Sequence, residues 1–213
     1  MEKNLSKEYS PQGNDTIGCD ECGTGCWAGP AMVCAVYIPP HVQIEGLADS
    51  KSFSKSQVGV RDDVSELIRR TSGVVFCVTP VPTWMIDEHG LSVSVIFTMG
   101  QAVRLVQRKV TRKVTAIFDG LAVPLGVPRG ISMVKADSKV ESVMAASIIA
   151  KSHRDRMMKA WAELPEFRNK WRFDLHKGYG TPLHRAEVAK FGVSRLHRRS
   201  VAPVAEYLNL HPE

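Results

Sequence analysis

Two adjacent acids, Asp20 and Glu21, follow a short apolar run and are followed almost directly by Gly23-Thr24-Gly25. Neighbouring carboxylates raise each other's pKa, because like charges at short range oppose ionisation. A divalent cation between them relieves this cost, since Mg²⁺ prefers oxygen ligands. Glycines let the backbone approach a ligand closely. The pattern indicates metal-assisted phosphate chemistry, although a surface turn is the alternative that the dipeptide alone favours.

Two further acids, Asp119 and Asp137, lie at the ends of predicted elements. Asp119 ends the β-branched run 114–118 and precedes a glycine. Asp137 lies just before Ser138 and Glu141, which fit a capping box at the start of an expected helix. A helix N-terminus favours a carboxylate there. Singly, each is an ordinary turn or helix-start acid, but with the first pair they supply four carboxylates suited to Mg²⁺ or Mn²⁺.

The elements that position these acids are read from hydrophobic periodicity and turn residues. Strands are predicted over 17–19, 32–38, 74–78 and 114–118, and helices over 62–70, 86–108, from about 137, and from Thr181-Pro182 to Gly192. Alternating strands and helices predict an α/β fold with a C-terminal helical extension. We expect a polar N-terminal leader over 1–16 and a single catalytic domain over 17–213, of which about 165–213 is the helical part.

Composition narrows the class of protein. The chain has 213 residues, 44% of them hydrophobic, and 28 Lys and Arg against 22 Asp and Glu. The resulting charge of +6 points weakly to polyanionic partners. With no signal peptide and no apolar run near the ~20 residues of a membrane span, we expect a cytoplasmic protein without a membrane partner.

The chain has five cysteines, an odd number, so they do not form a complete disulfide framework within the chain. Cys19, Cys22 and Cys26 are close enough in the chain to raise the question of a zinc site. Structural zinc needs four Cys or His ligands, commonly as two tight pairs, and no second pair is present. Small buried thiols are therefore the default interpretation.

The motifs, taken in order, resemble those of the ribonuclease HII family, and the resemblance extends over about residues 17–204. The segments that carry it are Asp20-Glu21-Cys22-Gly23-Thr24-Gly25 with Ala28-Gly29-Pro30, Gly46-Leu47-Ala48-Asp49-Ser50-Lys51, Ile86-Asp87, Phe118-Asp119-Gly120, Lys135-Ala136-Asp137-Ser138-Lys139, Ala145-Ala146-Ser147-Ile148-Ile149-Ala150-Lys151 with Arg154-Asp155, His176-Lys177-Gly178-Tyr179-Gly180-Thr181 and His197-Arg198-Arg199-Ser200. One such segment alone would be weak support for the resemblance. This many segments, in the order in which the family has them, are strong support.

The resemblance implies a ribonuclease H-like fold with a mixed central sheet flanked by helices. It implies an endonuclease that hydrolyses the RNA strand of RNA–DNA hybrids, and cleaves at ribonucleotides embedded in duplex DNA, leaving 5′-phosphomonoesters. Asp20, Glu21, Asp119 and Asp137 would be the catalytic residues and would bind Mg²⁺ or Mn²⁺ in a two-metal mechanism. We expect a monomer that acts on nucleic acid. The alternatives are a hybrid-duplex binding protein with weak or no cleavage, and a related metal nuclease of altered substrate choice.

Substrate recognition also follows from the resemblance. The backbone of Gly23, Thr24 and Gly25 would sense the 2′-OH, and Tyr179 would pack against the neighbouring sugar. Four lysines in matched motifs are candidates for phosphate contacts or for ordinary surface lysines. They are Lys51, Lys139, Lys151 and Lys177.

The C-terminal motifs leave other roles open. The basic group 195–199 either grips the duplex or fixes the tail to the core. We expect His184 and His197 to be structural, because the acids already supply a hard-oxygen site. His176 has either a substrate role or a role in loop packing.

The chain departs from the family pattern at several positions. Thr24 stands where the pattern has Arg or Lys, so a cationic phosphate contact is lost. Gly90 and Val140 replace a usual Asn and Ser, and Val201 replaces a usual Phe. Because the four acids are intact, the sequence predicts a divergent but active enzyme.

Overall fold

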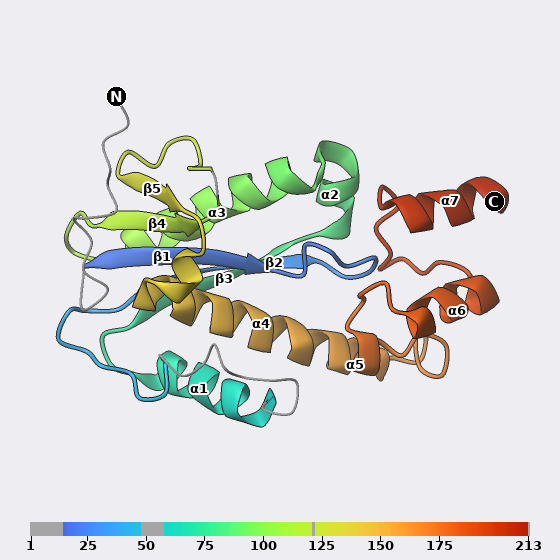
Figure 1. Ribbon diagram of the computed structural model, residues 1–213, viewed down its shortest axis with the longest axis horizontal. Helices are drawn as coiled ribbons and strands as arrows, with labels where there is room; N and C mark the ends of the chain where they lie inside the picture. The colour runs from blue at the N-terminus through green and yellow to red at the C-terminus, as the bar shows by residue number, and fades with distance from the viewer. Residues whose placement is uncertain (1–14, 48–57, 121, 213) are drawn as a thin grey trace.

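A five-stranded mixed sheet lies between two helical layers, with further helices beyond one end of the sheet (Figure 1). The computed structural model describes residues 15–47, 58–120 and 122–212. The strands, in spatial order β3-β2-β1-β4-β5, are β3 (Val75–Val81), β2 (Ala31–Tyr37), β1 (Thr16–Cys22), β4 (Thr115–Asp119) and β5 (Gly130–Met133). β1 pairs antiparallel with β2 and parallel with β4, which confirms the expected mixed sheet.

The helices fall into three groups. One face of the sheet is covered by α3 (Leu91–Gln107), and the other by α1 (Val58–Arg70) and α4 (Glu141–Ala162). The remaining elements are α2 (Thr83–His89), the 3₁₀ turn η4 (Ala136–Ser138), α5 (Phe173–His176), α6 (Pro182–Phe191) and α7 (Ala202–Leu210). None of the described helices is both long and apolar enough to cross a membrane.

Strand β2 shows why both faces need a helical cover. Successive side chains of a strand point to opposite faces. Ala31, Val33 and Ala35 belong to the core beneath α3, and the residues that alternate with them belong to the core beneath α1 and α4. A strand buried on both faces reads as a continuous apolar run, as residues 31–38 do.

Gly18 sets the distance between β1 and α4. A Cβ atom at this position would lie 2.1 Å from backbone atoms of both Ser142 and Val143. Only glycine therefore allows the first turn of α4 to lie directly on the strand that carries the acid pair.

Two local expectations prove wrong, and one strand was not predicted. The single helix expected over 86–108 is two helices, α2 and α3, separated at Gly90, whose φ of 81° suits glycine. The expected capping box does not form: α4 begins at Glu141 after Val140, without a side-chain cap. Ser138 lies in η4, where its hydroxyl donates to the Lys135 carbonyl at 2.7 Å. Strand β5 was not predicted at all.

Candidate active site

Asp20 and Glu21 are strand residues, so the interpretation of this pair as a surface turn is wrong. In the β1–β2 ladder, Asp20 pairs with Cys34 and Glu21 with Val33. Because side chains alternate along a strand, the two carboxylates leave opposite faces of β1. Asp20 lies on the α4 side, where the Ser147 side chain bonds to it, and Glu21 lines a hollow beneath α3.

The first carboxylate is costly to ionise in the absence of a cation. Asp20 is 5% exposed, and burial raises its pKa to about 7, against the lowering effect of the Ser147 hydrogen bond. The charges of Glu21 and Asp119 raise it further. Burial, followed by the Asp119 charge, likewise raises the pKa of Glu21. The Asp119 charge thus disfavours the ionisation of both Asp20 and Glu21, and a hard cation near these oxygens would offset that cost.

Asp119 connects the end of β4 to the segment that carries Asp137. Its Oδ1 accepts from the backbone N–H of Gly120 at 3.0 Å and from that of Ala136 at 2.8 Å. Asp137 follows Ala136 directly in η4. The fold therefore brings all four acid-bearing segments to the same end of the sheet.

An open hollow at this end includes Glu21, Thr24 and Asp119 in its lining. Its other wall comes from the first turns of α3 and the residues after β4: Leu91, Ser92, Val95, Ile96, Met99, Gly120 and Ala122. Asp137 is not among the lining residues. Within the described ranges, no three His, Cys, Asp or Glu side chains converge into a ready-made metal site. The acids are gathered near one another, and their all-oxygen chemistry fits Mg²⁺ or Mn²⁺.

The three N-terminal cysteines do not offer a competing zinc site. Cys19, Cys22 and Cys26 are free thiols. Burial raises the pKa of Cys22 to about 12, and also raises that of Cys26. Buried thiols with a raised pKa are unreactive, so these side chains pack as small apolar groups.

Arg198 supports the glycine loop, Gly23-Thr24-Gly25, from the buried side. Its side chain is fully buried and donates to three carbonyls: Nη2 to Gly23 at 2.7 Å, Nη1 to Thr24 at 2.8 Å and Nε to Gly29 at 2.9 Å. Burial lowers its pKa to about 10, so it stays charged at neutral pH. This contact joins residues 175 positions apart and decides between the two roles left open for Arg198: it fixes the tail to the core.

Arg154 makes the matching contact from α4. Its buried guanidinium donates to the carbonyls of Pro30 at 2.9 Å, Lys177 at 2.8 Å and Ala28 at 3.1 Å. It also fills the space above Gly23, where a Cβ atom would lie 2.2 Å from its Nε. Neither arginine was predicted to support the loop. The chain around Arg154 reads Lys-Ser-His-Arg-Asp-Arg, so nothing local in the sequence indicates that this side chain is buried.

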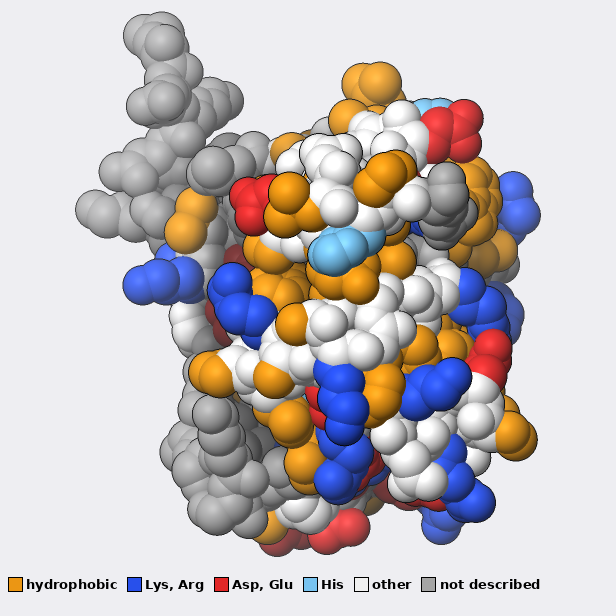
Figure 2. Space-filling view, turned by 90° about the vertical axis from the view of Figure 1, so that its right-hand side faces the viewer, with side chains coloured by type: hydrophobic (Ala, Val, Ile, Leu, Met, Phe, Trp, Pro, Cys, Tyr) orange, Lys and Arg blue, Asp and Glu red, His pale blue; other side chains and the backbone are white. Residues whose placement is uncertain are grey.

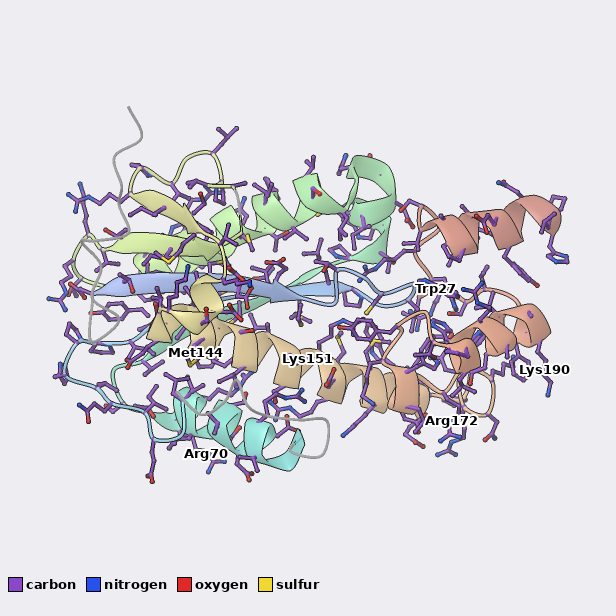
Figure 3. The ribbon with its side chains drawn as sticks, in the orientation of Figure 1. Trp27, Arg70, Met144, Lys151, Arg172 and Lys190 are labelled. Carbon is purple, nitrogen blue, oxygen red and sulfur yellow. The ribbon has the colours of Figure 1, made fainter. Side chains whose placement is uncertain are left out.

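Tyr179 lies against the glycine loop, paired with Cys26 by an isolated bridge. Lys151 Nζ is 5.2 Å from its ring centroid, within the range of a cation–π contact. Lys151 also follows Ser147, the partner of Asp20, by one helical turn on the same face of α4. Lys151 stands midway along this helix, on the way to the C-terminal helices (Figure 3). Measured along α4, Tyr179 therefore lies about one helical turn beyond the contact between Ser147 and Asp20.

The lysines proposed for phosphate contacts make bonds within the chain. Lys139 Nζ donates to the Val134 carbonyl at 3.0 Å, and Lys177 Nζ donates to the Asp174 carbonyl. Lys151 pairs with Asp155 at 2.8 Å. Lys51 lies outside the described residues. No lysine is thereby shown to bind phosphate, and this role stays a prediction.

A buried histidine cluster supports the loop that carries Tyr179. His184 Nδ1 lies 3.0 Å from the Tyr179 carbonyl, and its Nε2 lies 3.1 Å from His197 Nε2. His176 stacks on His184 at 4.0 Å between centroids and accepts from the Gly178 N–H at 3.0 Å. These rings bond to one another and to backbone groups of the loop, which fits the structural role expected for His184 and His197.

This cluster should make the fold sensitive to acid. Burial lowers the pKa of His184 from 6.5 to about 4, so the unfolded chain binds more protons between these values. Its stabilising contribution is complete above pH 6.5 and is lost as the pH falls through 4. We expect the free energy of unfolding to fall between pH 7 and pH 5 by about 2 kcal/mol more in the wild type than in His184→Gln.

Urea titrations at each pH measure this difference, with the exposed His89 as the matched control in His89→Gln. Parallel profiles for the wild type and His184→Gln would show that His184 is not the titrating group.

The family follows from comparison with known proteins. The family model described as Ribonuclease HII matches residues 17–202. The chain belongs to the ribonuclease HII family. Ribonuclease HII of Chloroflexus aggregans is 36% identical over 196 residues, covering 91% of this chain and 89% of that relative.

Solved structures agree on the fold. Ribonuclease H2 of Pyrococcus horikoshii OT3 has a TM-score of 0.70 at 21% identity, over 92% of this chain and 97% of that chain. Bst-RNase HIII in complex with Mn²⁺ has a TM-score of 0.66 at 19% identity, over 94% of this chain and 71% of that chain. The fold is therefore ribonuclease H-like. Family membership makes the protein a ribonuclease H-type endonuclease, dependent on divalent metal and acting on nucleic acid.

Proposed function

We propose that Asp20, Glu21, Asp119 and Asp137 bind two Mg²⁺ or Mn²⁺ ions, and that the enzyme cleaves the RNA strand of hybrids and ribonucleotides embedded in duplex DNA. The observation that supports this most is the electrostatic coupling of Asp20, Glu21 and Asp119 beside one open hollow. Metal ions there would activate water and stabilise the leaving oxygen. The four acids would hold and orient these ions.

The glycine loop is oriented to read a hydroxyl. In a planar trans peptide, the N–H points opposite to the preceding carbonyl. The carbonyls of Gly23 and Thr24 point to buried Arg198, so the N–H groups of Thr24 and Gly25 are directed away from it. Gly25 is exposed, and a Cβ atom there would meet nothing within 4 Å. We infer that these two amides face the substrate 2′-OH, which distinguishes RNA from DNA.

Tyr179 would then pack on the neighbouring sugar. The Cys26 bridge holds its backbone, and the cations Lys151 and Arg154 lie 5.2 and 5.7 Å from its ring centroid. A fixed ring next to a hydroxyl-reading loop supplies shape selection without base contacts.

Lys and Arg side chains at the C-terminal end of the molecule would contact the phosphates of the duplex backbone. Lys and Arg side chains are spread over this face, together with several Asp and Glu side chains (Figure 2). Lys170, Arg185 and Lys190 are exposed there. Phosphate contacts of this kind give affinity without sequence preference. A monomeric state and a cytoplasmic location remain predictions.

A cleavage assay on three matched duplexes tests this function. The duplexes are one RNA–DNA hybrid, one DNA duplex with a single ribonucleotide, and one all-DNA duplex. We expect cleavage of the first two with Mg²⁺ or Mn²⁺, none after chelation, and none of the third. Binding without cleavage would favour the hybrid-binding alternative. Equal cleavage of all three would instead identify a nuclease of altered substrate choice.

Position 24 should control affinity. Thr24 lines the hollow, so an arginine there would reach the substrate phosphates. For Thr24→Arg we expect KM to fall about fivefold and the salt dependence of binding to steepen by about 0.9 in log–log slope, the value for one phosphate. Steady-state kinetics at several salt concentrations measure both, and Thr24→Gln is the neutral control. An unchanged salt slope in Thr24→Arg would remove the charge explanation.

A further inference from the structure

A second cavity, of about 280 Å³, lies away from the acids, between the last turns of α3 and the start of β4. Its lining residues are Val103, Arg104, Gln107, Lys113, Val114, Ala116, Gly126, Val127, Pro128 and Arg129. Asp119 stands three residues beyond Ala116 in β4, about 10 Å at the rise of a strand. The lining shares no residue with that of the hollow beside the acids.

The cavity has an apolar floor and a cationic rim. Val103, Val114 and Ala116 are 3%, 5% and 1% exposed, so the floor belongs to the core. Arg104 is half-buried, and Lys113 and Arg129 are exposed. None of the ten lining residues, all of them described, is acidic. The rim therefore attracts anions and repels cations.

The walls are held by contacts within the chain. Arg104 Nη1 donates to the Leu125 carbonyl at 3.2 Å, which fixes the loop before β5 to α3. The Ala116 N–H donates to the Arg129 carbonyl at 2.9 Å, which fixes the same loop to β4. Gln107 Nε2 donates to the Arg112 carbonyl at 2.8 Å. Because these three hydrogen bonds hold its walls, the cavity is preformed before any ligand binds. Preformation lowers the entropic cost of binding.

We propose that this cavity binds a small organic anion: a carboxylate or phosphate monoester carried on an apolar body of one or two fused rings. A cavity of about 150 Å³ accommodates benzene, and drug-sized ligands need about 300 Å³ or more, so a two-ring body matches this volume. The ring would rest on Val103, Val114 and Ala116. The anionic group would face Arg104, Lys113 and Arg129.

The test is a titration of the ¹⁵N-labelled full chain with 2-naphthoate, followed by amide chemical shifts. Two probes separate the contributions: 2-naphthalenemethanol keeps the rings without the charge, and acetate keeps the charge without the rings. We expect saturable shifts confined to the lining residues, with a Kd of about 0.1 mM. The neutral alcohol should bind at least about fivefold more weakly, and acetate should not saturate.

Rim variants make the result specific. The double variant Lys113→Gln/Arg129→Gln changes two exposed side chains and should raise the Kd for 2-naphthoate about fivefold or more. The control Arg108→Gln/Lys109→Gln removes two exposed cations at the same end of α3 that do not line the cavity, and should leave the Kd unchanged. The proposal is overturned by an absence of saturable shifts, by shifts centred on Glu21 and Asp119, by equal binding of the alcohol, or by an unchanged Kd in the rim variant.

Discussion

Asp119→Asn should lower the rate of cleavage by about 10³-fold or more and leave the protein folded. The change removes a charge that raises the pKa of both Asp20 and Glu21, and with it a ligand for the ions that stabilise developing charge. The amide oxygen can still accept from Gly120 and Ala136, so the link between β4 and η4 is kept. Single-turnover cleavage of a duplex with one ribonucleotide measures the loss.

The matched control is Asp63→Asn, which changes an exposed aspartate of α1 and should cleave like the wild type. If Asp119→Asn retained more than about a tenth of the wild-type rate while folding normally, the carboxylate would not be a metal ligand that the reaction requires.

Arg198→Ala should destabilise the protein by about 3–5 kcal/mol. Three carbonyls, those of Gly23, Thr24 and Gly29, would lose a charged donor inside the fold, and each unsatisfied group costs about 1–3 kcal/mol. Arg198→Lys should recover only part of this loss, because a single ammonium cannot reproduce the geometry of the guanidinium fork. Urea denaturation measures both variants.

The neighbouring Arg195 provides the control. It is exposed and pairs with exposed Glu166, so Arg195→Ala should leave the denaturation midpoint unchanged. Equal midpoints for Arg198→Ala and Arg195→Ala would show that Arg198 does not support the loop.

The acids and the main strands could be predicted from the sequence because their signals are local. The run 31–38 is continuously apolar, and Asp119 directly follows the strand-forming run 114–118. Strand β5 could not be predicted this way: it has four residues, Gly-Ile-Ser-Met, and becomes a strand only by pairing with β4. Gly90 is a visible signal in the sequence for the break between α2 and α3.

The support of the glycine loop could not be predicted, because it depends on contacts distant in sequence. Arg195, Arg198 and Arg199 look equivalent in a basic segment, yet only the folded chain buries Arg198 beneath Gly23. Asp87 is a similar case: its carboxylate accepts from the backbone N–H groups of Arg199 and Ser200, 112 and 113 residues away. Such contacts determine which cation is structural and which side chains reach a substrate.

Asp137 decides whether four carboxylates form one metal centre, because it is the one of the four proposed ligands whose segment meets the others through Ala136 and which does not line the hollow beside Glu21 and Asp119. The measurement is Mn²⁺ binding, followed by electron paramagnetic resonance, to the wild type, Asp137→Asn and the control Asp63→Asn. We predict that Asp137→Asn weakens Mn²⁺ binding more than about tenfold, whereas the control binds like the wild type. Wild-type Mn²⁺ affinity in Asp137→Asn would contradict the four-carboxylate centre.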